Sequence, residues 1–253
     1  MYRLNIGASY HQMGKKNLPL FKGTARKFFE LAITNYNKAY ELAKALKLNN
    51  SSNGAFILKN MAMSHCEMKD YEKALPLAIK AAEIREKTEG VHPTTARNLY
   101  FIGSLYNSLG DKYTKKDKKT SDQHFTDALE YYNKALKMEM QLGPRRHSIV
   151  YEDLKSGLKR LLKKRQGDKT ELETYQKLFK EADKTAMSPE EVTLTFDSLP
   201  DVARRSAGDQ QEAQEEDDDL DDNEADDHAG ATRRRAPAPV FMTASKKRRC
   251  SIQ

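Results

Sequence analysis

The chain has 253 residues, with 44 Lys and Arg against 37 Asp and Glu for a net charge of +7, and 38% of its residues are hydrophobic. This composition predicts a modest core in one or two domains. The sequence contains no apolar run of about 18 residues, so no transmembrane helix is predicted. The N-terminal residues do not resemble a secretory signal, and two cysteines cannot form a disulfide framework, which favours a reducing compartment.

The first part of the chain repeats itself at a spacing of 96 residues. Each copy has Gly-x-x-Tyr, then Ala-x-x-x-Tyr-x-x-Ala further on, with Gly7, Tyr10, Ala32, Tyr36 and Ala39 in one copy and Gly103, Tyr106, Ala128, Tyr132 and Ala135 in the other. A shorter copy between them contains Ala62, Ala74 and Ala78. The two halves lie 25 residues apart in the outer copies and 12 apart in the middle copy, so the outer copies share a 13-residue insertion. A degraded fourth copy is predicted from Leu154 onward.

Each copy is predicted to form two amphipathic helices. Apolar and small residues recur at spacings of three and four, as in Ala74, Leu75, Leu77, Ala78, Ala81 and Ala82. Small residues let neighbouring helices cross closely, and the tyrosines fill gaps between stacked pairs. A single pair cannot bury its apolar face, so several pairs must stack.

This pattern resembles the tetratricopeptide repeat over roughly residues 1–165. The matching residues are Leu99, Ile102, Gly103 and Tyr106 on a first helix and Ala128, Tyr132 and Ala135 on a second. Residues 84–96, IREKTEGVHPTTA, are similar to the kinesin-light-chain subtype, and residues 142–147 are a weaker echo of it. The insertions depart from the family pattern, as does Ala78, which stands where an aromatic residue is expected. Another all-α bundle with alanine-rich packing is the alternative.

The resemblance implies an all-α, tetratricopeptide-like helix-pair solenoid of three to four units over residues 1–165. A terminal helical segment is expected over residues 166–200 and a disordered tail over residues 201–253. First helices of such solenoids line a concave groove that holds an extended or helical peptide, so a protein partner is expected. Asn60, Asn98 and Asn107 are polar candidates near this groove, and ordinary solvated surface is the alternative for each.

Both insertions are basic. Lys15, Lys16, Lys22, Arg26 and Lys27 lie in the first, and Lys112, Lys115, Lys116, Lys118 and Lys119 in the second. Because both occupy the same repeat position, we expect them to project from one edge of the solenoid. Such an edge attracts anionic lipid, nucleic acid or acidic protein. A solvated loop with no partner is the alternative.

The tail has a different composition from the body. Residues 1–200 hold 35 basic and 24 acidic residues, whereas residues 201–253 hold 13 acidic and 9 basic ones. Residues 209–228 include 12 carboxylates and only one aliphatic side chain larger than alanine, so this segment cannot bury enough apolar surface to fold. A further hypothesis is that the acidic tract, residues 212–227, folds back onto the lysines of the second insertion.

The sequence finishes with a predicted prenylation signal. Cys250 is followed by Ser251, Ile252 and Gln253, a Cys-a-a-X pattern whose final Gln favours farnesylation. One lipid chain gives only reversible membrane binding, so a second signal is needed. The cluster Lys246, Lys247, Arg248 and Arg249 supplies it beside an anionic membrane. An accidental cysteine is the alternative.

A rival interpretation uses the same charges. Arg233, Arg234 and Arg235 form a second basic cluster, and the two clusters together match a bipartite nuclear import signal. With the acidic tract, this pattern is typical of a nuclear adaptor or an acidic-tail chaperone. An import signal has no use for Cys250, so the sequence favours a cytoplasmic protein at the membrane periphery, with the nucleus as the alternative.

No catalytic constellation is found in the sequence. It contains no phosphate-binding glycine loop and no His-Glu-x-x-His motif, and His65 and Cys66 stand alone as metal-ligand candidates. We therefore expect a non-enzymatic adaptor with no cofactor, no metal and no small-molecule substrate, and do not expect nucleic acid as its partner.

The sequence opens inside a repeat without a capping residue, which suits either a longer array or pairing through that open face.

Overall fold

The computed structural model describes residues 2–142, 149–164 and 169–184, which form helices and the short turns between them, with no strand in these ranges. All of them belong to one compact unit within residues 1–213. The helices are α1 (Tyr2–Asn17), α2 (Lys22–Ala45), α3 (Ser52–Glu67), α4 (Tyr71–Glu89), α5 (Pro93–Tyr113), α6 (Lys118–Gln141), α7 (Ile149–Lys164) and α8 (Lys169–Lys184).

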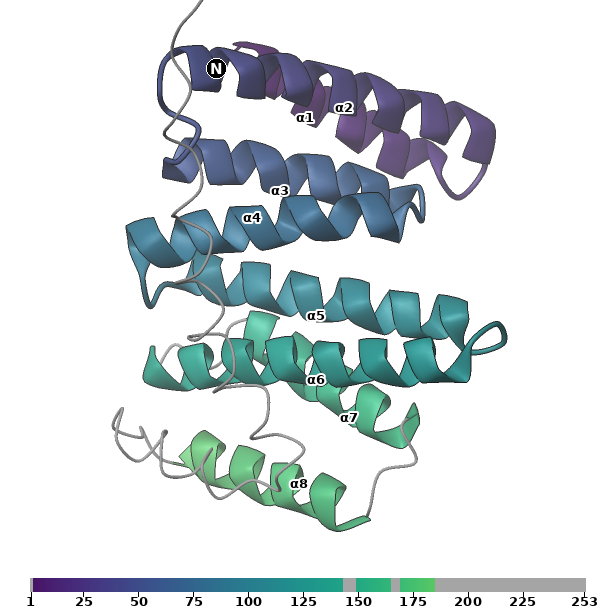
Figure 1. Ribbon diagram of the computed structural model, residues 1–253, viewed down its shortest axis with the longest axis vertical. Helices are drawn as coiled ribbons and strands as arrows, with labels where there is room; N and C mark the ends of the chain where they lie inside the picture. The colour runs from purple at the N-terminus through teal and green to yellow at the C-terminus, as the bar shows by residue number, and fades with distance from the viewer. Residues whose placement is uncertain (1, 143–148, 165–168, 185–253) are drawn as a thin grey trace, which may run out of the picture. The chain divides into compact units, whose positions relative to one another are not determined.

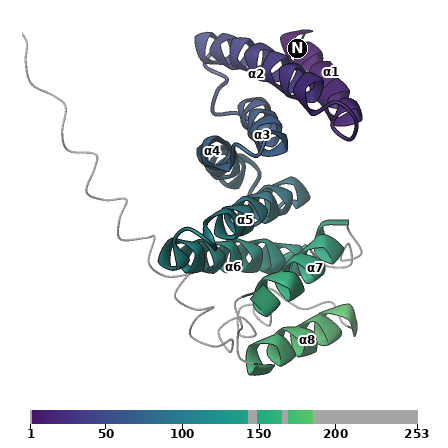
Figure 2. The same cartoon turned by 90° about the vertical axis from the view of Figure 1, so that its right-hand side faces the viewer.

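Consecutive helices form hairpins that stack in chain order (Figure 1). Helix α1 packs on α2, α3 on α4 and α5 on α6, while α2 contacts α3, α4 contacts α5 and α6 contacts α7. Figure 2 shows the first helices α1, α3, α5 and α7 on one side and the second helices α2, α4 and α6 on the other. The predicted all-α helix-pair solenoid is confirmed.

Short capping motifs separate the helices. Ser51 accepts a hydrogen bond from the backbone N–H of Gly54 at the start of α3, and Asp117 accepts one from Thr120 at the start of α6. These side chains satisfy backbone N–H groups that have no partner inside a helix. Gly90 ends α4 with a φ of 58°, in the left-handed region that glycine adopts without strain.

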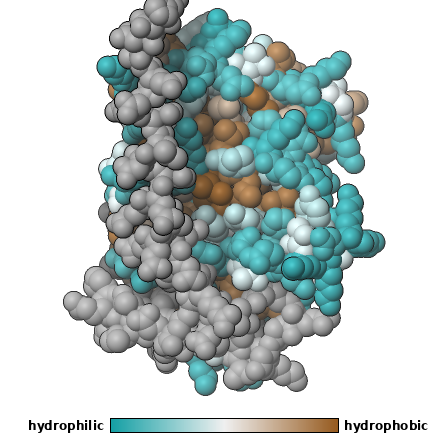
Figure 3. All heavy atoms as spheres, in the orientation of Figure 1, coloured by the Kyte–Doolittle hydropathy of each residue, from teal (hydrophilic) through white to brown (hydrophobic). Residues whose placement is uncertain are grey.

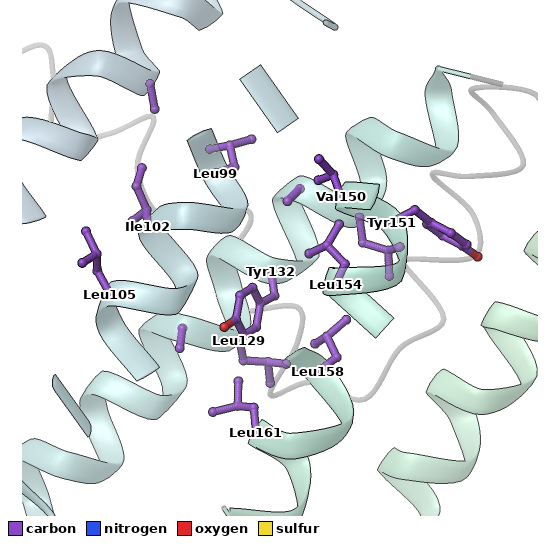
Figure 4. Packing of buried hydrophobic residues seen from close by; sticks show 14 of the residues in the cluster. Leu99, Ile102, Leu105, Leu129, Tyr132, Val150, Tyr151, Leu154, Leu158 and Leu161 are labelled. Carbon is purple, nitrogen blue, oxygen red and sulfur yellow. The ribbon is translucent and has the colours of Figure 1, made fainter. Parts of the chain in front are cut away.

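Glycine–aromatic pairs fix the crossing of the outer hairpins. A Cβ atom added to Gly7 would lie 2.6 Å from the Tyr36 ring, and one added to Gly103 would lie 2.6 Å from the Tyr132 ring. In the middle hairpin, Ala62 and Ala78 are both buried, so a smaller pair fills the same position. The structure thus accounts for the missing aromatic at residue 78. Around Tyr132, the leucines of α7 complete the core (Figure 4).

The 13-residue insertion is mostly extra helix. Counted toward the turn from the aligned residues (Gly103 against Ala62, Ala128 against Ala74), it adds five residues to the end of the first helix, one to the turn and seven to the start of the second helix. A second glycine–aromatic contact holds each extension together, Gly14 with Phe29 and Gly110 with Phe125. The turns of α1–α2 and α5–α6 therefore reach further than the α3–α4 turn (Figure 1). We call residues 15–27 the first tip and residues 111–119 the second tip.

Candidate partner-binding site

The three predicted groove asparagines have different environments. Asn60 on α3 is half-buried and donates a hydrogen bond to the backbone oxygen of Phe56 at 2.8 Å. Asn107 on α5 is half-buried and accepts one from Lys164 at 3.3 Å. Asn98 is only 2% exposed, and neither polar atom of its side chain has a hydrogen-bond partner. Asn98 is therefore an interior group of α5, and the three side chains do not share one exposed surface.

A cluster of cations lies between α3 and α5, where sequence reasoning missed it. Lys59 on α3 is half-buried beside Arg97 on α5 and Arg85 on α4. Burial, together with the positive charges of Arg97 and Arg85, lowers the pKa of the Lys59 ammonium to about 8. Within the part of the chain that the structure describes, no carboxylate forms an ion pair with Lys59 or Arg97. The cluster therefore holds unneutralised positive charge at a partly dehydrated position.

Arg85 is already neutralised by its own neighbours. It is 7% exposed, and its Nη1 donates to Glu89 Oε1 at 2.5 Å and to Thr94 Oγ1 at 3.2 Å. Burial raises the pKa of Glu89, but hydrogen bonds from Thr94, Ser52 and Arg85 outweigh this and lower it below its usual range. This network joins the end of α4 to the start of α5 and keeps Glu89 engaged with Arg85.

Apolar and hydrogen-bonding side chains lie at neighbouring helical positions to the two unpaired cations. Phe56, Asn60 and Met63 follow each other at three- and four-residue spacing on α3, and Phe56 is 44% exposed. Phe101 lies one turn after the exposed Arg97 on α5 and is half-buried. We call this set the α3–α5 face, which comprises Phe56, Lys59, Asn60, Met63, Arg97 and Phe101. It combines anion-binding groups with apolar surface.

The five lysines predicted for the basic edge are exposed at the second tip. Lys112 is engaged, because its Nζ lies 2.5 Å from a carboxylate oxygen of Glu72 on α4. The other four, Lys115, Lys116, Lys118 and Lys119, form no ion pair among the described residues. The acidic tract, both arginine- and lysine-rich clusters (Arg233, Arg234, Arg235 and Lys246, Lys247, Arg248, Arg249) and Cys250 lie outside the described residues.

The described helices contain neither a cluster of metal ligands nor a thiol that is ionised at neutral pH. Residues 2–142, 149–164 and 169–184 contain no group of three His, Cys, Asp or Glu that could hold a metal ion. Burial raises the pKa of the Cys66 thiol to about 11, so this half-buried cysteine is protonated at neutral pH. None of the described helices is both long and apolar enough to span a bilayer.

Residues 54–112 match the tetratricopeptide repeat family. The match covers nearly all of α3, the whole of α4 and α5 as far as Lys112, which is one hairpin and the first helix of the next. No curated protein matches the chain. Tetratricopeptide repeats are typically non-enzymatic modules that bind other proteins. The α3–α5 face lies within the matched residues, and this match, together with the stacked helix pairs, identifies residues 54–112 as tetratricopeptide repeats, a fold that supports a role as a protein-interaction scaffold.

Proposed function

We propose that this scaffold is a non-enzymatic adaptor whose α3–α5 face binds an acidic, extended segment of a partner protein. The observation that carries the proposal is the unneutralised pair Lys59 and Arg97. A partner carboxylate would supply a negative charge to pair with Lys59 and Arg97, which no described carboxylate does. The stretch 84–96 and the long repeat spacing favour the kinesin-light-chain-like subtype within the family.

The side chains of the α3–α5 face favour a partner segment that contains both acidic and apolar residues. Charge-assisted hydrogen bonds from an ammonium or guanidinium to a carboxylate are roughly twice as strong as neutral ones. Phe56 and Met63 lie beside the cations and offer contact area for apolar side chains between the acids. A basic or neutral peptide would leave Lys59 dehydrated and unpaired, so its binding should be weak.

A peptide titration tests the proposal. The probe is a fluorescent peptide rich in Asp, Glu and Leu, with its amide counterpart, in which Asn and Gln replace the acids, as a control. We expect Lys59→Met and Arg97→Met each to weaken binding of the acidic peptide by roughly tenfold. Lys80→Met, which removes an exposed cation from α4, should leave the affinity unchanged. Equal affinities for Lys59→Met and Lys80→Met would refute the assignment.

Membrane attachment through the tail is the second part of the proposal. Cys250 is the proposed farnesylation site, and Lys246, Lys247, Arg248 and Arg249 supply the electrostatic second signal at an anionic cytoplasmic membrane. The Cys-a-a-X pattern and its flanking cations support this assignment. Mass spectrometry of the C-terminal peptide from native cells should find the farnesyl mass on Cys250, and an unmodified thiol would contradict it.

A nuclear adaptor or acidic-tail chaperone is the alternative function. The paired clusters Arg233–Arg235 and Lys246–Arg249, ten residues apart, favour it. Imaging the chain and its Cys250→Ser variant in cells separates the two functions. Loss of membrane signal in the variant supports the adaptor at the membrane, whereas nuclear signal from both proteins supports the alternative.

A further inference from the structure

The first tip combines exposed apolar side chains with uncompensated positive charge. Leu20 is 79% exposed and Phe21 is 60% exposed, although both are large apolar residues. They lie in the turn between α1 and α2, at the end of a projecting hairpin. Burial within the fold does not account for them, since Leu20 is more exposed than any other large hydrophobic residue of the described helices and turns.

The charge around this apolar apex is mostly positive. The first 29 residues contain no Asp or Glu. Arg26 is engaged with Glu30 at 3.2 Å and Asp70 at 3.5 Å. The lysines of the first tip, Lys15, Lys16, Lys22 and Lys27, form no ion pair within the described ranges. An apolar apex ringed by cations matches the chemistry of a membrane interface that contains anionic lipid.

The apex of the first tip projects beyond the neighbouring hairpin, which the tip contacts through the Arg26–Asp70 ion pair. With a rise of about 1.5 Å per residue, the added five and seven helical residues extend the α1–α2 hairpin by roughly 8–10 Å past the α3–α4 turn. A cavity of about 500 Å³, lined partly by Lys22 and Phe29, separates the tip from Glu67 at the end of α3. The headgroup region could therefore receive the apex without a clash with α3 or α4.

The second tip repeats this geometry 96 residues later. Helices α2 and α6 begin and end at positions 96 residues apart, and a cavity of about 410 Å³, lined partly by Lys118 and Phe125, underlies the second tip. Both tips point to the same edge, where the surface is largely hydrophilic (Figures 1 and 3). The second tip carries four lysines that form no ion pair with another described residue, and no exposed Leu or Phe. A flat anionic surface can touch both projections at once.

We infer that the two tips form a membrane-docking edge, in which Leu20 and Phe21 enter the interfacial layer of an anionic bilayer and the lysines of both tips bind lipid phosphates and carboxylates. This edge acts without any lipid on Cys250. It is also distinct from the α3–α5 face, so a partner segment and a bilayer can be bound together. An acidic protein or a nucleic acid would use the lysines but leave Leu20 and Phe21 in water.

The chain contains no tryptophan, so a single introduced indole reports on one position. The full chain carrying Cys250→Ser is combined with Phe21→Trp and titrated with phosphatidylcholine vesicles with or without phosphatidylserine. We expect a blue shift of the emission and quenching by brominated lipid only with the anionic vesicles. Leu46→Trp, at the 60%-exposed opposite end of α2, should show neither change.

Vesicle co-sedimentation provides the second readout in the same Cys250→Ser background. Leu20→Ser with Phe21→Ser should weaken binding by roughly tenfold, while the matched change Leu42→Ser with Leu46→Ser should not. Binding that persists while the residue 21 indole stays in water would overturn the inference and assign the contact to the basic tail. None of these variants can be prenylated, because each carries Cys250→Ser. A negative result therefore says nothing about the proposed farnesylation of Cys250, which mass spectrometry tests separately.

Discussion

Replacing Lys59 with Met should stabilise the free protein, although it deletes a charged side chain from a largely polar surface. The fold lowers the pKa of Lys59 from 10.5 to about 8, and each unit corresponds to about 1.4 kcal/mol. The protonated lysine therefore costs at most about 3.5 kcal/mol of folding free energy at neutral pH. Partial exposure of the side chain screens part of this cost, so we expect a gain of about 1–2 kcal/mol.

The assay is urea unfolding at pH 7, followed by far-UV circular dichroism. Lys80→Met is the matched control, because this exposed lysine of α4 has the same length and charge, and its substitution should change stability by less than about 0.5 kcal/mol. A Lys59→Met protein that is less stable than the parent would refute the electrostatic reasoning.

The pH dependence gives an independent check on the same group. Between pH 8 and 10.5 the unfolded chain keeps the Lys59 proton and the folded chain releases it, so the parent gains stability as the pH rises. The stability advantage of Lys59→Met should therefore be largest below pH 8 and shrink toward pH 10. A constant advantage across this range would show that the gain comes from packing rather than from charge.

Three further predictions concern packing, acidity and the tail. Gly103→Ala should destabilise the fold by about 2 kcal/mol in urea unfolding, because its Cβ meets the Tyr132 ring, whereas Gly23→Ala, with nothing within 4 Å, should be neutral or stabilising. Burial and Lys15 lower the pKa of His11, so thermal stability should fall as the pH drops below 6.5, and His11→Gln should flatten this dependence. Charge reversal of Lys115, Lys116, Lys118 and Lys119 should loosen the acidic tract in low salt, and unchanged tail dynamics by NMR would argue against that contact.

Much of the fold could be predicted because its determinants are local and repeated. Small residues at fixed spacing, with a tyrosine opposite them in the outer hairpins, predict the hairpins from the sequence alone. The insertions were harder to interpret, because a charged stretch is equally compatible with a loop or with an extended helix. A usable signal was present, since Gly14 and Gly110, like Phe29 and Phe125, also lie 96 residues apart.

The binding face depends on contacts that one helix cannot reveal. Asn98 looked like a surface group, but the phase of α5 turns it inward, and that phase is set by packing against the neighbouring helices. Lys59 looked like an ordinary lysine of α3, because Arg97 and Arg85 come from two other helices. Only their arrangement in space shows that three cations gather without a free carboxylate.

The most direct test of the adaptor function is the pKa of Lys59, measured by NMR of its side-chain carbon next to the ammonium, with and without a saturating acidic peptide. Our account predicts a value near 8 in the free protein and a rise to 10 or above when partner carboxylates neutralise the cluster. A Lys59 that titrates at the same pH in both states would contradict the proposed binding face.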